Sequence, residues 1–220
     1  MLKNLTNSSE RLLEPMERIS EILFALIMVL TFTCSFSVAQ AGREEVRTML
    51  VGALGCNLAW GIIDGVFYLM GNFSTQGQKI TQWKALRTAT SPADAHRIIS
   101  DSLPPLVASV LTSAEIEDVR QKLTQLRDVP VSPRLKKADW LGAFGVFLLV
   151  FLSTFPVVFP FLFINDAKLA LRVSNIVAIA MLFLVGFRFG QYSGHHPWRM
   201  GISMVILGGV LVGITISLGG

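Results

Sequence analysis

Long uncharged stretches dominate the pattern of apolar and polar positions along the chain. Residues 22–42, 140–165 and 200–220 contain no Asp, Glu, Lys or Arg, and residues 173–187 form a shorter stretch of the same kind. A fifth stretch, residues 48–78, carries a single charge. A helix needs about 20 apolar residues to cross the core of a bilayer. The pattern therefore predicts five transmembrane helices, at residues 21–41, 47–71, 140–163, 171–191 and 199–218.

Composition supports this interpretation. Of the 220 residues, 52% are hydrophobic and 15% are charged, whereas soluble domains carry about 25% charged residues. The 18 Gly and 15 Phe are typical of packed membrane helices. Two Cys exclude a disulfide scaffold. We expect an all-α integral membrane protein in which a small cytoplasmic helical insert separates the second and third transmembrane helices.

The basic residues predict the orientation of the chain. Fifteen Lys and Arg flank the predicted spans on one side, whereas Arg43, Arg47, Lys168 and Arg172 are the four on the other side. Since cytoplasmic loops carry the excess of Lys and Arg, the N-terminus is predicted to be cytoplasmic and the C-terminus to face outward. This distribution also explains the net charge of +4 without nucleic-acid binding. Ala39-Gln40-Ala41 resembles a signal-peptidase site, but the acidic segment before it argues against cleavage.

Four regions follow: a cytoplasmic amphipathic segment (1–20), the first two spans (21–71), the insert (72–138) and the last three spans (139–220). Ser91, followed by Pro92 and Asp94, predicts the start of a short helix that ends near Ser102. Thr112 and Glu115 form a second capping box, which predicts an amphipathic helix to about Asp128.

The insert and its edges hold ten basic and seven acidic residues. We interpret it as a basic cap on anionic lipid. The alternative is a metal-collecting surface built from His96, Glu115, Glu117 and Asp118. This alternative is weaker because the net positive charge repels divalent cations.

Asp64 is the ionisable residue expected at membrane depth, which makes it a candidate functional residue. Asn57 lies seven residues before it, two turns away on the same helical face. On the first span, Glu21, Met28 and Ser35 recur at the same spacing. If the two spans run antiparallel with Glu21 at the cytoplasmic interface, Met28 is level with Asp64 and Ser35 with Asn57.

This arrangement predicts an ion pathway through Asp64, Asn57, Met28 and Ser35, with Glu21 at the cytoplasmic entrance. Asp64 and Met28 are the predicted metal contacts. A carboxylate and a thioether together suit Fe(II) or Mn(II) better than Na⁺ or Ca²⁺. Asp64 would hold the cation and a proton in turn.

Other interpretations remain open. Asp64 could pair with Tyr68 or Asn175 and serve only to hold helices together. His195 and His196 could form a metal pair, although a short cytoplasmic turn favours an anchoring role at the interface. An intramembrane enzyme built from these histidines and Asp64 is the least favoured, because no nucleophile accompanies them. The sequence also lacks a Walker loop, a GxSxG motif and an HExxH motif, so we expect neither ATP-driven transport nor enzymatic activity.

Packing motifs are frequent. Gly61 and Gly65, Gly186 and Gly190, and Gly209 and Gly213 are spaced four residues apart, which permits close helix approach. Two prolines, at positions 156 and 160, interrupt the third span.

These features together resemble the VIT1/CCC1 family of vacuolar iron and manganese transporters. The shared pattern consists of five spans, a cytosolic N-terminus and a helical insert after the second span. The Gly/Ala-rich stretch from Gly52 to Gly65, the proline-interrupted stretch Phe151–Phe163 and the Gly-rich final spans carry the likeness. Two features differ from the family: no acid lies between Ile22 and Gly42, and the insert is basic.

The resemblance implies a homodimer that exports Fe(II) or Mn(II) from the cytosol in exchange for protons. Its partners would be the bilayer, the divalent ion as substrate and a second copy, with no permanently bound cofactor and no nucleic acid. The membrane would be the inner membrane in a bacterium or a vacuolar-type membrane in a eukaryote. The alternative function is a non-transporting membrane scaffold whose insert recruits a partner.

Overall fold

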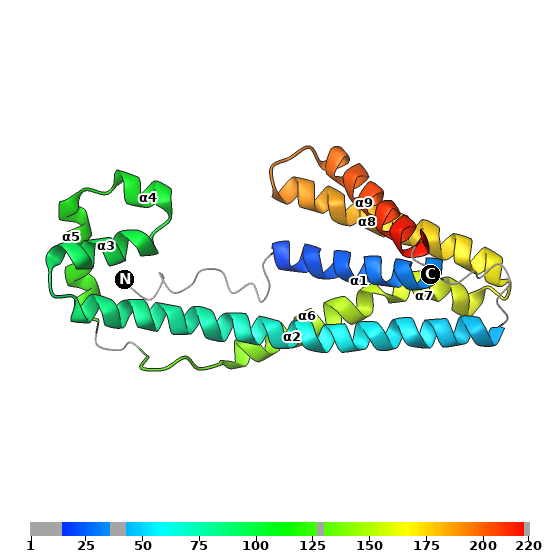
Figure 1. Ribbon diagram of the computed structural model, residues 1–220, viewed down its shortest axis with the longest axis horizontal. Coiled ribbons are helices and arrows are strands. Elements are labelled where there is room, and N and C mark those ends of the chain that lie inside the picture. Colours follow the sequence, from blue (N-terminus) through cyan, green and yellow to red (C-terminus); the bar gives the residue numbers. More distant parts are fainter. Residues whose placement is uncertain (1–14, 36–42, 127–129, 218–220) are drawn as a thin grey trace. The chain divides into compact units, whose positions relative to one another are not determined.

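The computed structural model describes residues 15–35, 43–126 and 130–217, and all secondary structure in these ranges is helical (Figure 1). The helices form two compact units. Residues up to Tyr68, together with those from Lys137 onward, form one, which we call the membrane unit. Leu69–Lys136 form the other, which we call the insert unit.

In its described part, the membrane unit contains one helix that extends beyond it and five that lie within it. The extended helix is α2 (Arg43–Thr88), which belongs to this unit as far as Tyr68. The others are α1 (Pro15–Ser35), α6 (Lys137–Ser153), α7 (Phe155–Phe163), α8 (Ala167–Tyr192) and α9 (Pro197–Ser217).

Helix α1 lies at the centre of this unit. It packs against α6, α8 and α9. Four apolar side chains of α1 are buried, and each is at most 4% exposed: Ala25, Leu26, Val29 and Leu30. They follow one another at intervals of one, three and one residues. Such a spacing gives one continuous helical face, so burial of this face positions α1 in the core.

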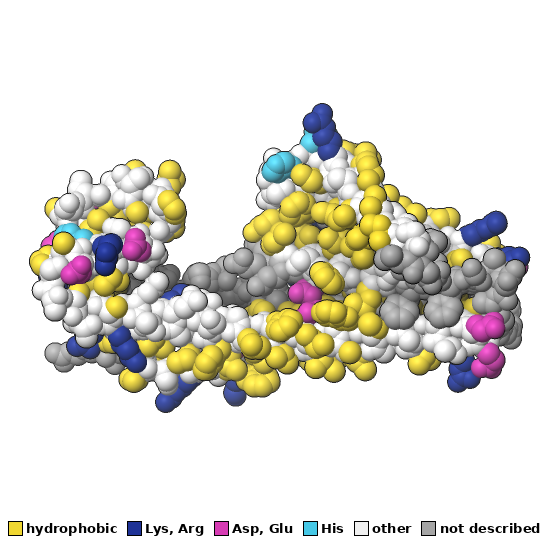
Figure 2. Space-filling model, in the orientation of Figure 1, with side chains coloured by type: hydrophobic (Ala, Val, Ile, Leu, Met, Phe, Trp, Pro, Cys, Tyr) yellow, Lys and Arg dark blue, Asp and Glu magenta, His cyan; other side chains and the backbone are white. Residues whose placement is uncertain are grey.

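Four described helices are long and apolar enough to cross a membrane, namely α2, the continuous pair α6–α7, α8 and α9. This confirms an all-α integral membrane protein. The central helix α1 is not among these four. Hydrophobic side chains cover much of the visible face of the membrane unit in Figure 2, and Ile62, Phe67, Ile176 and Ile206 are among the exposed ones. Such a surface suits contact with lipid.

Two helices extend beyond the spans predicted for them. The first span was expected to begin at residue 21, and α1 begins at Pro15, so Met16 and Ile19 lie on the same helix as that predicted span. The second span was expected to end at residue 71, and α2 continues to Thr88. No proline interrupts this extension, and Ile80 and Leu86 on it are buried, so packing in the insert unit maintains the helix.

The third span is divided. Helix α6 ends at Ser153 and α7 begins at Phe155, with Pro156 in its first turn. Proline lacks an N–H donor, so the backbone before it loses helical hydrogen bonds. The buried Ser174 hydroxyl of α8 donates to the Val157 carbonyl at 2.7 Å, which fixes the start of α7 against α8.

Two of the three glycine motifs are in close contacts. A Cβ on Gly65 would lie 3.1 Å from the Ala143 carbonyl of α6, and one on Gly186 would lie 2.6 Å from the Met200 carbonyl of α9. Gly209 and Gly213 have open space on their Cβ side. Small residues therefore bring α2 close to α6 and α8 close to α9.

The insert unit has its own core. Helices α3 (Pro92–Ser102), α4 (Pro105–Val110) and α5 (Ser113–Thr124) follow the end of α2. The cap at Ser91 and the Thr112–Glu115 capping box are confirmed. The helix α4 was not predicted, and α5 ends at Thr124, four residues before the expected end. The buried core residues are Leu86, Ala95, Ile99 and Ile116.

Candidate ion-binding site

The first two helices bring two carboxyl groups together inside the membrane unit. The side chain of Asp64 on α2 forms a hydrogen bond with that of Glu21 on α1. Both residues are partly buried. One turn further along, the rings of Phe24 and Trp60 approach to 6.0 Å between centroids. These two contacts define an antiparallel register in which Glu21 is level with Asp64.

The expected register was therefore wrong by seven residues. It placed Met28 level with Asp64 and Glu21 at the cytoplasmic entrance. That prediction assumed that α1 and α2 both end at the membrane interface, but both helices extend beyond the expected ends. The register of α1 against α2 therefore follows from the side-chain contacts and not from the positions of the helix ends. Glu21 belongs to the same site as Asp64.

Asn57 forms a second polar level on α2. Its side chain is 0% exposed, and neither its amide nitrogen nor its amide oxygen has a hydrogen-bond partner in the described part of the chain. In the observed register, Met28 on α1 comes to this level, since each residue lies seven positions from the carboxyl pair. Two helical turns separate the two levels by about 10 Å. A buried amide without partners is unfavourable by about 1–3 kcal/mol, so a ligand that contacts it would remove a penalty.

The hydroxyl groups near this end of α1 are bound within the helix itself. The Thr31 hydroxyl donates to the Met28 carbonyl at 2.7 Å, and the buried Thr33 hydroxyl donates to the Leu30 carbonyl at 3.2 Å. Ser35, the remaining predicted pathway residue, ends α1, and its side chain lies outside the described residues.

Close packing of α2 on α6 holds Asp64 in place. Gly65, the next residue, lies against the Ala143 backbone. One turn further, the Tyr68 ring covers Gly142, where an added Cβ would lie 2.5 Å from the ring. Trp60 and Tyr68 also pack against an apolar cluster formed by α1 and α6. The position of the carboxyl pair thus depends on a three-helix contact.

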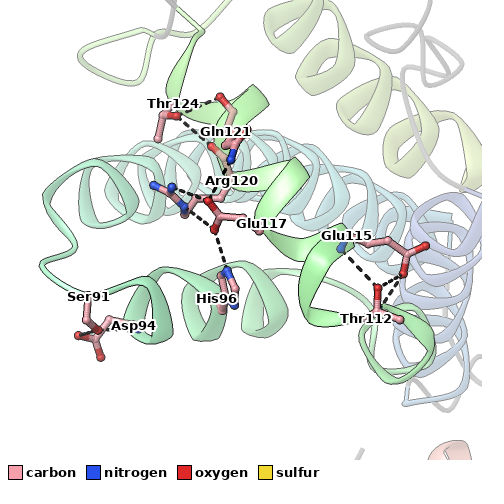
Figure 3. A network of polar contacts seen from close by, with 9 residues as sticks. All are labelled: Ser91, Asp94, His96, Thr112, Glu115, Glu117, Arg120, Gln121 and Thr124. Atoms are coloured by element: carbon pink, nitrogen blue, oxygen red, sulfur yellow. Dashed lines mark hydrogen bonds and ion pairs between the residues drawn. The ribbon is translucent and has the colours of Figure 1, made fainter.

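A second group of polar side chains lies in the insert unit (Figure 3). Glu117 accepts hydrogen bonds from Arg120 at 2.6 and 2.8 Å, and His96 Nε2 lies 2.9 Å from the same carboxylate. The Arg120 guanidinium, followed by His96, holds the pKa of Glu117 well below its usual range. In return, Glu117 raises the pKa of Arg120.

These contacts argue against the predicted metal-collecting surface. The Glu115 carboxylate accepts from the Thr112 backbone N–H at 2.8 Å and from its hydroxyl at 2.7 Å, which lowers the pKa of Glu115. The Glu117 carboxylate is paired with Arg120, and Asp118 is exposed. Within the described ranges, no three His, Cys, Asp or Glu side chains are placed to hold a metal ion. His96, Glu115, Glu117 and Asp118 therefore serve in caps and ion pairs or face solvent.

The turn between α8 and α9 fits an anchoring role. His195 and His196 are both exposed, and His195 Nδ1 lies 3.1 Å from the Ser193 carbonyl. The Trp198 ring packs against those of Phe183 and Phe187, at 5.4 and 5.9 Å between centroids. These aromatic contacts stabilise the turn, and the arrangement brings no third metal-ligating group to the histidines in the part of the chain that the structure describes.

Comparison with known proteins identifies the family. A sequence model of the VIT family matches residues 92–220, which is more than half of the chain and extends from α3 to α9. The match begins after α2, so the carboxyl pair and Asn57 lie outside it. A search of curated proteins gave no match. On the strength of this match, the chain belongs to the VIT family, whose members are membrane metal-ion transporters and not enzymes.

Proposed function

We propose that this protein exports divalent iron or manganese from the cytosol in exchange for protons, and that the ion passes between α1 and α2. The observation that carries the proposal is the contact between the Glu21 and Asp64 side chains. Ionisable groups at membrane depth are costly, and they mark ion pathways and proton relays in membrane proteins.

The chemistry of a carboxyl pair suits exchange. Two carboxylates in contact repel each other when both are ionised, so either protons or a cation must accompany them. A divalent cation that binds the pair displaces the protons, and protonation releases the cation. Glu21 and Asp64 would thus alternate between a metal-bound and a protonated state.

Asn57 and Met28 would form a second ion-binding site on the pathway, about 10 Å from the carboxyl pair along the helices. The Asn57 amide oxygen would accept the ion, because no protein group satisfies it within the described chain. In the orientation that the basic flanks predict, the carboxyl pair would lie toward the cytosol, so the ion would move outward from Glu21 and Asp64 to Asn57. The membrane would be the inner one in a bacterium and a vacuolar-type one in a eukaryote.

The donor atoms bear on the choice of metal. Carboxylate and amide oxygens suit Mn(II), whereas a thioether suits softer ions. Because Met28 is level with Asn57 and not with Asp64, the first ion-binding site offers oxygen donors from Glu21 and Asp64. We therefore expect Mn(II) to enter at least as readily as Fe(II). As in the family that the sequence resembles, the working form would be a homodimer.

Flux in proteoliposomes tests the proposal. Purified protein is reconstituted, Mn(II) is added outside, and internal Mn(II) and pH are followed with trapped dyes. We expect Asp64→Asn and Glu21→Gln each to abolish Mn(II) entry and the linked proton movement. Asp101→Asn, which alters an exposed carboxylate of the insert unit, is the matched control and should transport normally.

The two carboxyl variants also separate the possible roles of Glu21. If Glu21 merely marked the entrance, Glu21→Gln would raise the half-saturating Mn(II) concentration and leave maximal flux intact. If it is half of the site, its loss is as severe as that of Asp64. Normal flux in a folded Asp64→Asn variant would exclude this pathway. The scaffold alternative would be favoured if the unmodified protein gives no flux and the folded Asp64→Asn variant has an altered oligomeric state.

A further inference from the structure

The insert unit contains an apolar pocket whose lining residues are not part of the proposed ion pathway. It has a volume of about 530 Å³ and lies among α2, α3 and α5. Its apolar wall includes Leu86 and Ile99 from the insert core, together with Leu103, Val119 and Leu123. Cavities of 300–1,000 Å³ with such a lining are typical of sites for small apolar ligands.

The polar residues that line the pocket include hydrogen-bond donors and no carboxylate. They are Lys79, Gln82, Trp83 and Ser102, and no Asp or Glu is among the lining residues. Trp83 Nε1 is buried and has no hydrogen-bond partner in the described chain. The Arg87 guanidinium lies over the ring of the same indole, 4.8 Å from its centroid. An anionic group would complement Lys79 and Arg87, and its oxygens would satisfy the orphaned indole N–H.

The acidic residues of the insert unit are engaged elsewhere or face solvent. Glu117 is paired with Arg120, Glu115 is part of the cap at Thr112, and Asp94 is hydrogen-bonded to Ser91. Lys79 is therefore the charged residue among those that line the pocket, and most of the other lining residues are apolar. This combination matches an amphiphile with one negative headgroup and a hydrocarbon chain.

We infer that this pocket binds an acyl chain of an anionic membrane lipid, with the headgroup at Lys79. The helix that carries Lys79 and Trp83 is continuous with a transmembrane helix, since α2 extends without a break from Arg43 to Thr88. Lys79 follows the last residue of the predicted span by eight positions, about 12 Å along the helix. We therefore assign the pocket to an anionic lipid of the bilayer that this helix enters. This inference does not depend on the transport proposal.

Quenching of Trp83 fluorescence tests the inference. The full protein is placed in nanodiscs that contain phosphatidylglycerol brominated in the middle of its chains, and phosphatidylcholine with the same chains is the comparison. Bromine quenches an indole on contact, and Trp83→Phe identifies the contribution of Trp83 among the four tryptophans. We expect saturable quenching by the anionic lipid and weak quenching by the zwitterionic one.

Two lysine variants test the recognition of the headgroup. Lys79→Gln should raise the mole fraction of anionic lipid needed for half-maximal quenching about fivefold, as expected for one lysine that contacts an anionic headgroup. Lys84→Gln removes an exposed lysine of the same helix that does not line the pocket, and it should have no such effect. Val119→Trp, which fills the pocket, should abolish the quenching.

Three results would overturn the inference: no quenching of Trp83, equal quenching by both lipids, or equal effects of the two lysine variants. If Trp83→Phe does not fold, native mass spectrometry of the purified protein provides the same decision. Anionic lipid should then remain bound to the unmodified protein and to Lys84→Gln, less of it should remain on Lys79→Gln, and it should be lost from Val119→Trp. Equal lipid retention in all four proteins would contradict the assignment.

Discussion

Replacing Asn57 by leucine should make the protein more stable and at the same time inactive. The Asn57 side chain is fully buried, and both polar atoms of its amide lack partners within the described residues. Leucine has nearly the same shape and no polar atoms. Since a buried unsatisfied polar group costs about 1–3 kcal/mol, Asn57→Leu should raise the free energy of unfolding by about that amount. This corresponds to a factor of about 5–150 in the unfolding equilibrium.

The stability can be measured by titration with sodium dodecyl sulfate in mixed micelles, and the activity by Mn(II) flux in proteoliposomes. Asn72→Leu is a matched control, because Asn72 lies on the same helix and makes a polar interaction in the structure. Its replacement should give no gain in stability and should leave the flux intact. The comparison separates the effect of an orphaned amide from a general preference of α2 for leucine.

Two outcomes would refute the reasoning. A loss of stability in Asn57→Leu would mean that the amide is hydrogen-bonded in the folded protein, so it would not be available to coordinate an ion. A gain in stability with unchanged Mn(II) flux would mean that the amide is unsatisfied but does not lie on the pathway. Only a gain in stability combined with a loss of flux supports the conclusion that the Asn57 amide serves transport and lowers the stability of the folded protein.

Two further predictions concern packing and pH. Gly142→Ala places a Cβ 2.5 Å from the Tyr68 ring, whereas Gly55→Ala meets no atom within 4 Å; the first should therefore be less stable than the second by about 1–3 kcal/mol in the same detergent titration, and equal stabilities would contradict the observed contact of α2 with α6. The pKa of Glu117 is lowered in the folded protein by Arg120, so this ion pair stabilises the insert unit above the ordinary pKa of 4.5 and is lost as the pH falls below it. The protection factors of the α5 amides, which are exchange rates corrected for the intrinsic effect of pH, should fall at acidic pH in the full protein, and Glu117→Gln should show the lower protection already at neutral pH; protection factors that do not change with pH in the unmodified protein would exclude this role.

Local signals in the sequence were sufficient to predict much of the fold. Uncharged stretches identify spanning helices because the bilayer core excludes charge, and the cap at Ser91 and the capping box at Thr112 fix helix starts through contacts within four residues. The extension of α2 to Thr88 was not predictable in this way. It depends on the burial of Leu86 against Ile99 and Ile116, which are distant in sequence.

The same distinction applies to the candidate site. Asp64 and Asn57 stand out in the sequence because polar residues are rare in an apolar span. The partner of Asp64 could not be predicted, because every register that differs by two turns places the same face of α1 against α2. The contact of Phe24 with Trp60 selects one register. Glu21 was consequently predicted as a pathway residue, but at a level seven residues away from that of Asp64.

The carboxyl pair has a consequence for the stoichiometry of exchange. Glu21 and Asp64 together carry two negative charges when ionised, so one divalent cation or two protons leave the site neutral, whereas a single carboxylate would leave a metal-bound site with a net positive charge. An uncompensated charge in a low-dielectric region is strongly unfavourable. We therefore expect two protons to be exchanged for each Mn(II), with no net charge movement. Mn(II) flux in proteoliposomes should then be insensitive to an imposed potassium diffusion potential and sensitive to an imposed pH gradient. If the membrane potential alone drives the flux, the pair does not balance the charge of the ion, and Asp64 acts without Glu21.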